Sequence, residues 1–272
     1  MPEKNIHDES GFSLIEMAMT IVISGIVFTM VLGMMRPLQV NIPIEQTTIT
    51  LREIEGALRT HVERYGRLPC PAETTLPPNH SDYGREADCS DASPPSGIFD
   101  TDSGRDSREI WIGSVPLRDL DLPEYYARDG WGNRITYAVT KNLAVDGLFD
   151  NNEGGIFIED SAGNSMTDTD GGALYVLISH GEDGKGASNI NGNVFFPCTG
   201  STDLDAENCD FRNAGTIDAT FISTTKSEGT VFYDDMILYK TYIGSLSTPS
   251  CGNRGMIFAP GHPESEADGC LD

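Results

Sequence analysis

Glu16 has the clearest chemical consequence in this sequence, because it places a carboxylate at the start of a long apolar run. From Met17 to Met35 no residue is charged. A helix of that length, at about 1.5 Å per residue, nearly spans the ~30 Å hydrocarbon core of a membrane. An ionised side chain inside that core costs roughly 2.5–3.5 kcal/mol on insertion scales. Glu16 therefore predicts a membrane-spanning helix whose carboxylate has a partner of opposite charge.

Common catalytic motifs are absent from the sequence. It has no G-x-S-x-G, no P-loop, no H-E-x-x-H and no Rossmann glycine pattern. Of its five histidines, His7 lies near the N-terminus, His61 on the polar side of a predicted helix, and the others in predicted loops. Ser179 and His180 are adjacent, so they cannot face each other as nucleophile and base. These observations indicate that the protein is not an enzyme.

Length and charge narrow the classes of function. The chain has 272 residues, 38% of them hydrophobic, which is enough for a globular core after one membrane anchor. Its net charge is −24, with 18 basic against 42 acidic residues. Because nucleic-acid binding depends on Lys and Arg that displace counterions, no nucleic-acid partner is expected. Such acidity suits an exposed protein that holds Ca²⁺.

All six cysteines follow the apolar run, and none forms a C-x-x-C pair. They are Cys70, Cys89, Cys198, Cys209, Cys251 and Cys270. An even number of cysteines in an acidic translocated domain predicts disulfides rather than a zinc site. We expect neighbours in sequence to pair, because short loops close at the smallest entropic cost, although other pairings remain open.

The segment Gly11–Glu16, which reads GFSLIE, resembles the class III signal of type IV pilins and of type II secretion pseudopilins. The resemblance implies that a prepilin peptidase cleaves between Gly11 and Phe12 and methylates the new amino terminus. The charged amine of Phe12 and the carboxylate of Glu16 on a neighbouring subunit would then neutralise each other in an apolar medium. The alternatives are a carboxylate at the headgroup level and a cleaved secretory signal peptide.

A second helical pattern follows the apolar run. Pro37 and Pro43 interrupt the first pattern, and apolar residues then recur every three or four positions until Gly66 and Pro69 end the helix. The predicted organisation has four parts: a leader at 1–11, a membrane or filament-core half-helix at 12–36, an amphipathic half-helix at 37–66, and a periplasmic pilin-like globular domain at 67–272.

Residues 110–140 also resemble the segment that follows the helix in many pseudopilin-like proteins. The run Asp129–Asn133, which reads DGWGN, predicts a tight turn before a strand at 135–139. We expect Trp131 to fill the core. Further strands are predicted at 156–158, 174–179 and 236–242.

The strand at 174–179 leads into HGEDGKG at 180–186, similar to the turn that precedes the calcium loop of major pseudopilins. The resemblance implies that Ca²⁺ bridges Asp183 and either Asp234 or Asp235. The alternative for this segment is a solvated turn. No other cofactor is expected.

The expected fold is α+β and type IV pilin-like, with a long bent N-terminal helix on a mostly antiparallel sheet and disulfide-stapled loops. The expected function is that of a minor structural subunit of a type II secretion pseudopilus. Its partners would be the prepilin peptidase, other pilin or pseudopilin subunits and the inner-membrane assembly platform. The chain would cross the bacterial inner membrane once before it enters the filament. Two alternatives remain open, a minor pilin of a type IV pilus and a membrane-tethered periplasmic enzyme or binding domain.

Overall fold

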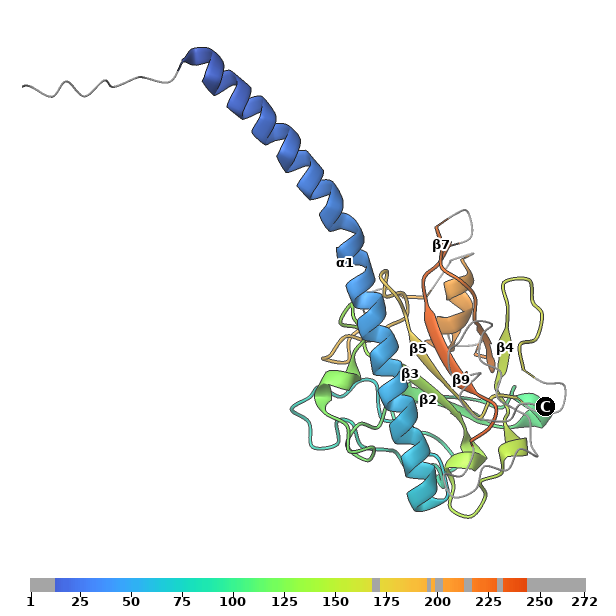
Figure 1. The fold of residues 1–272 in the computed structure, drawn as a ribbon. Helices are drawn as coiled ribbons and strands as arrows, with labels where there is room; N and C mark the ends of the chain where they lie inside the picture. Colours follow the sequence, from blue (N-terminus) through green and yellow to red (C-terminus); the bar gives the residue numbers. More distant parts are fainter. Residues whose placement is uncertain are drawn as a thin grey trace, which may run out of the picture. The chain divides into compact units, whose positions relative to one another are not determined.

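The computed structural model describes residues 13–167, 172–194, 197–198, 203–212, 217–228 and 232–243, apart from the side chains of 32–41. Helix α1 runs from Leu14 to Tyr65 (Figure 1). Pro37 and Pro43 lie within it and do not end it, although each removes a hydrogen bond from the helical ladder. By its contacts the chain divides into two compact units, and the boundary lies between Ile44 and Glu45.

The second unit contains a five-stranded sheet in which every neighbouring pair is antiparallel. Its strands, in spatial order, are β1 (Phe99–Thr101), β2 (Ile110–Ser114), β3 (Thr136–Thr140), β5 (Tyr175–Ser179) and β9 (Met236–Lys240). Two small sheets pair β4 (Phe157–Glu159) with β6 (Thr220–Ile222), and β7 (Ser227–Glu228) with β8 (Phe232–Tyr233). Short 3-10 helices are η1 (Arg105–Ser107), η2 (Glu124–Ala127), η3 (Lys141–Ala144), η4 (Asn151–Glu153) and η5 (Leu204–Arg212).

Residues of α1 beyond Glu45 form one wall of the core. Leu51, Ile54 and Leu58 lie one helical turn apart and are buried against the sheet face that carries Trp111 and Tyr137. Burial of each such side chain contributes about 1.5–3 kcal/mol. In Figure 1 this part of the helix lies across β2, β3 and β5. The amphipathic pattern of the sequence thus fixes which helix face meets the sheet.

The opposite face of the sheet is buried as well. Ile112, Val176 and Ile178 pack there against Phe211 of η5 and Phe221 of β6. Alternate strand residues point to opposite faces, so a strand covered on both sides is apolar throughout. This explains why residues 174–179 read as a nearly continuous apolar run.

The turn at Asp129–Asn133 forms as the sequence predicts, but its tryptophan is not in the core. The Asp129 carboxylate accepts hydrogen bonds from the backbone N–H groups of Trp131 (3.0 Å) and Asn133 (2.9 Å) and from the Ser179 hydroxyl (2.7 Å). Trp131 lies in the middle of this turn, before the chain enters β3, and is only partly buried. The core tryptophan is Trp111 on β2.

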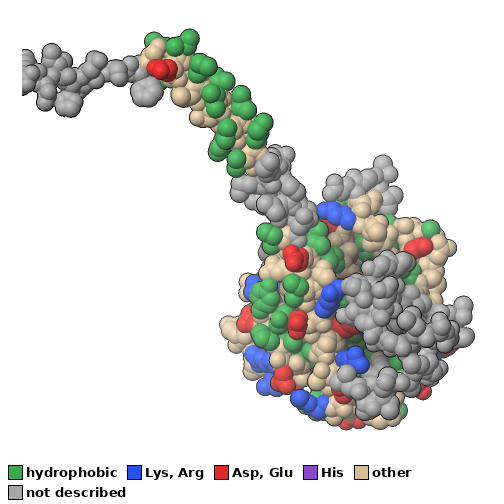
Figure 2. All heavy atoms as spheres, viewed as in Figure 1, with side chains coloured by type: hydrophobic (Ala, Val, Ile, Leu, Met, Phe, Trp, Pro, Cys, Tyr) green, Lys and Arg blue, Asp and Glu red, His purple; other side chains and the backbone are tan. Residues whose placement is uncertain are grey.

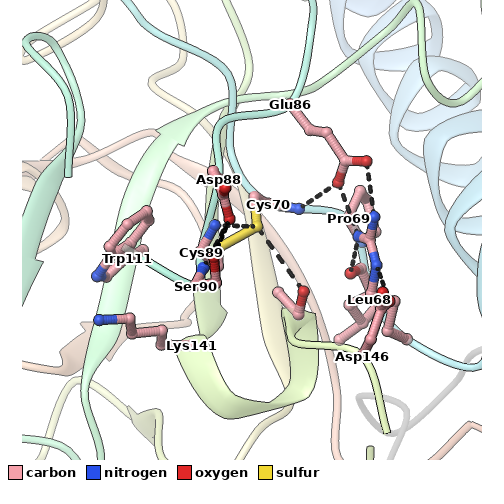
Figure 3. The surroundings of a disulfide bond; sticks show 12 residues. Leu68, Pro69, Cys70, Glu86, Asp88, Cys89, Ser90, Trp111, Lys141 and Asp146 are labelled. Atoms are coloured by element: carbon pink, nitrogen blue, oxygen red, sulfur yellow. Dashed lines mark hydrogen bonds and ion pairs between the residues drawn. A yellow bond between two sulfur atoms is a disulfide. The ribbon is translucent and has the colours of Figure 1, made fainter. Parts of the chain in front are cut away.

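Two disulfides are present in the described part of the chain, Cys70–Cys89 and Cys198–Cys209. Cys251 and Cys270 lie outside the described residues. Near Cys70–Cys89, the Glu86 carboxylate accepts the backbone N–H of Cys70 (3.0 Å) and two guanidinium nitrogens of Arg67 (both 2.8 Å; Figure 3). The disulfide and this ion pair together fasten the long loop after α1 to the end of the helix.

Replacing both Cys70 and Cys89 with alanine is expected to lower the free energy of unfolding by about 3 kcal/mol. The two residues are 19 positions apart, and a crosslink of that span removes this much loop entropy from the unfolded chain. Urea denaturation of the wild type and the double variant measures the difference. Equal midpoints and slopes would show that the crosslink does not stabilise the fold.

Candidate functional site

The first candidate site is the predicted cleavage and assembly segment at the N-terminus. The structure describes it from Ser13 onward, and Gly11 and Phe12 lie outside the described residues. Glu16 lies in the first turn of α1, and its carboxylate accepts a hydrogen bond from the backbone N–H of Ser13 at 2.9 Å. The first N–H groups of a helix have no partner within the helix, and their positive end attracts an anion. Glu16 thus caps its own helix within a single chain.

The helix that follows Glu16 exposes apolar side chains. Leu14–Val31 is 18 residues long, has a mean hydropathy of 2.1 and has no buried residue. Leu14 is 89% exposed and Phe28 64%. Figure 2 shows hydrophobic side chains, in green, over this part of the helix. By length and composition it is a helix able to cross a membrane, and no other described residue covers its apolar side chains.

A second site brings together carboxylates from three separate segments. Asp183 lies in the turn after β5, Asp205 in η5, and Asp234 between β8 and β9. Each offers one carboxylate oxygen, and the three oxygens lie within 4.8 Å of one another. Asp205 is fully buried and Asp234 nearly so. We call these three residues the acidic pocket.

Within the described part of the chain, each of the two buried aspartates of the acidic pocket uses one oxygen for the fold, and its other oxygen has no hydrogen-bond partner. Asp234 Oδ2 accepts the backbone N–H groups of Glu182 (2.8 Å) and Asp183 (3.1 Å), whereas its Oδ1 is buried and unpaired. Asp205 Oδ1 accepts the backbone N–H of Asp234 (3.2 Å), whereas its Oδ2 is buried and unpaired. Buried oxygens without a partner are costly, and a bound cation would satisfy them.

The turn at 180–186 approaches the acidic pocket closely because of its glycines. Gly181 has a φ of +58°, and a Cβ built on it would lie 2.4 Å from the Asp234 carbonyl oxygen. Gly186 has a φ of +79°, and its Cβ would lie 2.1 Å from that of Cys209. A side chain at either position would clash, so only glycine allows the turn to pack against η5 and Asp234.

The electrostatics of the acidic pocket favour a cation. Burial, and then the charge of Asp234, raise the pKa of Asp205 to about 7. Burial also raises the pKa of Asp234 above its usual value. Lys185 offsets part of the negative charge, since its Nζ lies 3.6 Å from Asp183 and 3.0 Å from Asp203. Closely spaced carboxylates with raised pKa values are stabilised in their charged form by a divalent cation.

The sequence prediction identified this region but only part of its residue set. Asp183 and Asp234 do lie together. Asp235 is buried next to Asp234, but its Oδ2 accepts a hydrogen bond from Asn208 (2.8 Å), and it is not one of the three grouped carboxylates. Asp205 was missed, because it belongs to a segment without family resemblance. The only available signal was its position four residues before Cys209, whose pairing with Cys198 folds the segment back.

His180 lies at the end of β5 and is fully buried. Its Nε2 is 2.9 Å from the Thr136 hydroxyl, and its Nδ1 has no partner among the described residues. Burial, and then the charge of Arg212, lower the pKa of His180 to about 3. The imidazole is therefore neutral in the folded protein under ordinary conditions.

This neutral histidine predicts acid sensitivity. Between pH 6.5 and about 3 the unfolded chain binds a proton at His180 that the folded protein does not, so stability falls as the pH falls through this window. His180→Gln is expected to flatten this part of the pH dependence, because glutamine does not titrate. Urea denaturation of both proteins at several pH values measures the two slopes. Parallel curves would mean that His180 does not contribute.

Comparison with known families identifies one segment. A family model described as the prokaryotic N-terminal methylation motif matches residues 6–32. The matched segment contains Gly11, Phe12 and Glu16 together with the start of the apolar helix. No curated protein matches the chain significantly, and no solved structure does so either.

Proposed function

We propose that this chain, which carries the N-terminal methylation motif of the type IV pilin and pseudopilin family, is a structural subunit of a type II secretion pseudopilus. A prepilin peptidase removes residues 1–11 and methylates Phe12. The mature chain crosses the inner membrane once, holds its globular domain in the periplasm, and joins other subunits through its N-terminal helix. Its role in protein secretion is structural and not catalytic.

The observation that carries this proposal is the combination of the motif with an apolar helix that nothing in the described part of the chain covers. Leu14–Val31 is apolar and unburied, and Glu16 stands at its start. A simple membrane tether has no use for a carboxylate at that position, because the charge opposes insertion. In an assembly the same carboxylate pairs with the amino terminus of a neighbouring subunit, which sets the axial register. Retention of Glu16 suits a subunit that docks beneath another one.

A minor pilin of a type IV pilus is the second candidate, since both systems use the same motif. The length of the chain, 272 residues, favours a minor over a major subunit in either system. Neighbouring genes for a secretin and for secreted hydrolases support the pseudopilus, whereas a gene for a retraction ATPase supports the pilus. A membrane-tethered periplasmic enzyme or binding domain is the third candidate.

Intact mass of the membrane-extracted protein, with and without a co-expressed prepilin peptidase, tests the proposal. We expect a chain that begins at Phe12 and is heavier by one methyl group only when the peptidase is present. A chain that retains residues 1–11 with an active peptidase would show that the motif is not processed. The tethered-domain candidate would then lead.

We further propose that the acidic pocket binds Ca²⁺. Calcium takes six to eight oxygen ligands, and carboxylates are its most common protein ligands. Support comes from the carboxylate oxygens of Asp183, Asp205 and Asp234 within 4.8 Å of one another, two of which belong to fully or nearly buried side chains with an unpaired oxygen. When bound, the ion would neutralise the pocket and link the turn after β5, η5 and the β8–β9 connection.

A further inference from the structure

A groove of about 300 Å³ lies between α1 and the turn at residues 119–122. Its helix wall is one face of α1 and includes Glu53, Ala57, Thr60, His61 and Arg64. The opposite wall holds Asp119, Leu120, Asp121 and Leu122. All of these residues belong to the second compact unit. The volume is at the lower end of that of ligand-binding clefts.

His61 lies in the wall of this groove, although the helical pattern places it on the polar side of α1. It is only 5% exposed because the turn at 119–122 covers this side of the helix. Both ring nitrogens are buried; one faces the backbone of Asp119, and the other has no hydrogen-bond partner among the described residues. Burial lowers the pKa of His61, so its ring is neutral and carries one free acceptor nitrogen. A buried acceptor nitrogen without a partner indicates a ligand with a hydrogen-bond donor.

The charges around the groove favour a cationic ligand. Glu53, Asp119 and Asp121 supply three carboxylates, whereas Arg64 supplies one positive charge. The Arg64–Asp121 pair is 3.4 Å long and its side chains are 57% and 79% exposed, so water screens it and a competing cation exchanges with it readily. The groove therefore has an excess of negative charge.

The remaining lining residues suit a side chain with an apolar stem. Ala57, Leu120 and Leu122 provide aliphatic surface, and the ring of Tyr65 stands at the rim, 53% exposed. Tyr65 also packs against His61 in a tilted arrangement, with ring centroids 4.5 Å apart and 43° between the ring planes. A long basic side chain buries its methylene groups on apolar surface, and a guanidinium also stacks on an aromatic ring.

We propose that this groove binds an arginine side chain of a partner protein. The stem packs on Ala57, Leu120 and Leu122, and the guanidinium donates to the carboxylates and to the free nitrogen of His61. A protein is the expected source because a chain of net charge −24 attracts basic protein surfaces over long distances. The proposal does not depend on the assembly role of the N-terminal helix.

NMR of the full-length protein in detergent micelles, with ¹³C-labelled histidine, tests this proposal. The probe is the blocked pentapeptide acetyl-Gly-Gly-Arg-Gly-Gly-amide, and the control peptide carries citrulline, which has the same shape without the charge. The His61 signal is identified by its loss in His61→Gln. We expect the arginine peptide to shift the His61 signal saturably with a dissociation constant of roughly 1 mM, and the citrulline peptide to bind about tenfold more weakly or not at all.

Two variants make the test specific to the groove. Glu53→Gln combined with Asp121→Asn removes two of the carboxylates and is expected to weaken peptide binding about tenfold. Asparagine tolerates the positive φ of 55° at position 121, so the turn is retained. Glu63→Gln changes an exposed carboxylate of the same helix outside the groove and is expected to leave binding unchanged.

Several results would overturn the proposal. Equal binding of the citrulline peptide would show that the groove does not select a cation. Unchanged binding to the double variant would place the peptide elsewhere. A shift with agmatine but none with the peptide would assign the groove to a small free cation instead of a protein, and no saturable shift with any probe would exclude it as a cation site.

Discussion

Glu16→Ala is expected to abolish incorporation of this chain into filaments while its membrane insertion is preserved. Loss of the carboxylate removes a charge whose burial in hydrocarbon costs roughly 2.5–3.5 kcal/mol, so insertion becomes more favourable. In an assembly, the amino terminus of the neighbouring subunit loses its only expected counter-charge. Removing one partner of a buried ion pair costs about 3–5 kcal/mol, which corresponds to at least a hundredfold loss of incorporation.

Two measurements on the same cells separate insertion from assembly. Carbonate extraction of membranes reports insertion, and the amount of the chain in filaments sheared from cells that express the other subunits reports assembly. Thr20→Ala is the matched control, because the Thr20 hydroxyl only donates to the Met17 carbonyl of its own helix (2.9 Å). Normal incorporation of Glu16→Ala would favour a simple tether.

Calcium is expected to raise the thermal midpoint of the wild-type protein and the free energy of unfolding. A ligand at one hundred times its dissociation constant stabilises the state that binds it by about 2.7 kcal/mol. The acidic pocket also predicts that the order of stability of the wild type and Asp205→Asn reverses between chelator and calcium. In chelator, Asp205→Asn is expected to be more stable than the wild type, because the amide carries no charge where burial and Asp234 raise the pKa of the native carboxyl to about 7. In calcium, the variant is expected to be less stable, because it lacks a ligand.

Urea denaturation of both proteins in chelator and in calcium measures this reversal. The asparagine oxygen still accepts the backbone N–H of Asp234, so the variant retains the hydrogen bond that holds η5. Asp102→Asn, at an exposed position, controls for the change in net charge and is expected to respond to calcium as the wild type does. The same order of stability in both conditions would mean that Asp205 is not a calcium ligand.

Local features of the sequence were sufficient to predict the methylation motif and the apolar helix at the N-terminus. An apolar run without charges, a carboxylate at its start and the GFSLIE string are contiguous, so their chemistry does not depend on the rest of the fold. The end of the helix at Gly66 also depends on local sequence. Glycine tolerates a φ of +69°, and in this conformation the Gly66 N–H donates to the Val62 carbonyl at 2.8 Å. Four predicted strands coincide with β3, β4, β5 and β9 to within two residues at either end.

Tertiary structure determines which residues form the acidic pocket and which line the groove beside α1. Asp205 joins Asp183 and Asp234 only because η5 folds back against the turn after β5, and no pattern in one segment encodes that approach. His61 follows the polar spacing of its helix, yet a turn some sixty residues later in the chain covers it. Periodicity predicts which face of an element is apolar, whereas the segment that covers a polar position depends on contacts between distant residues.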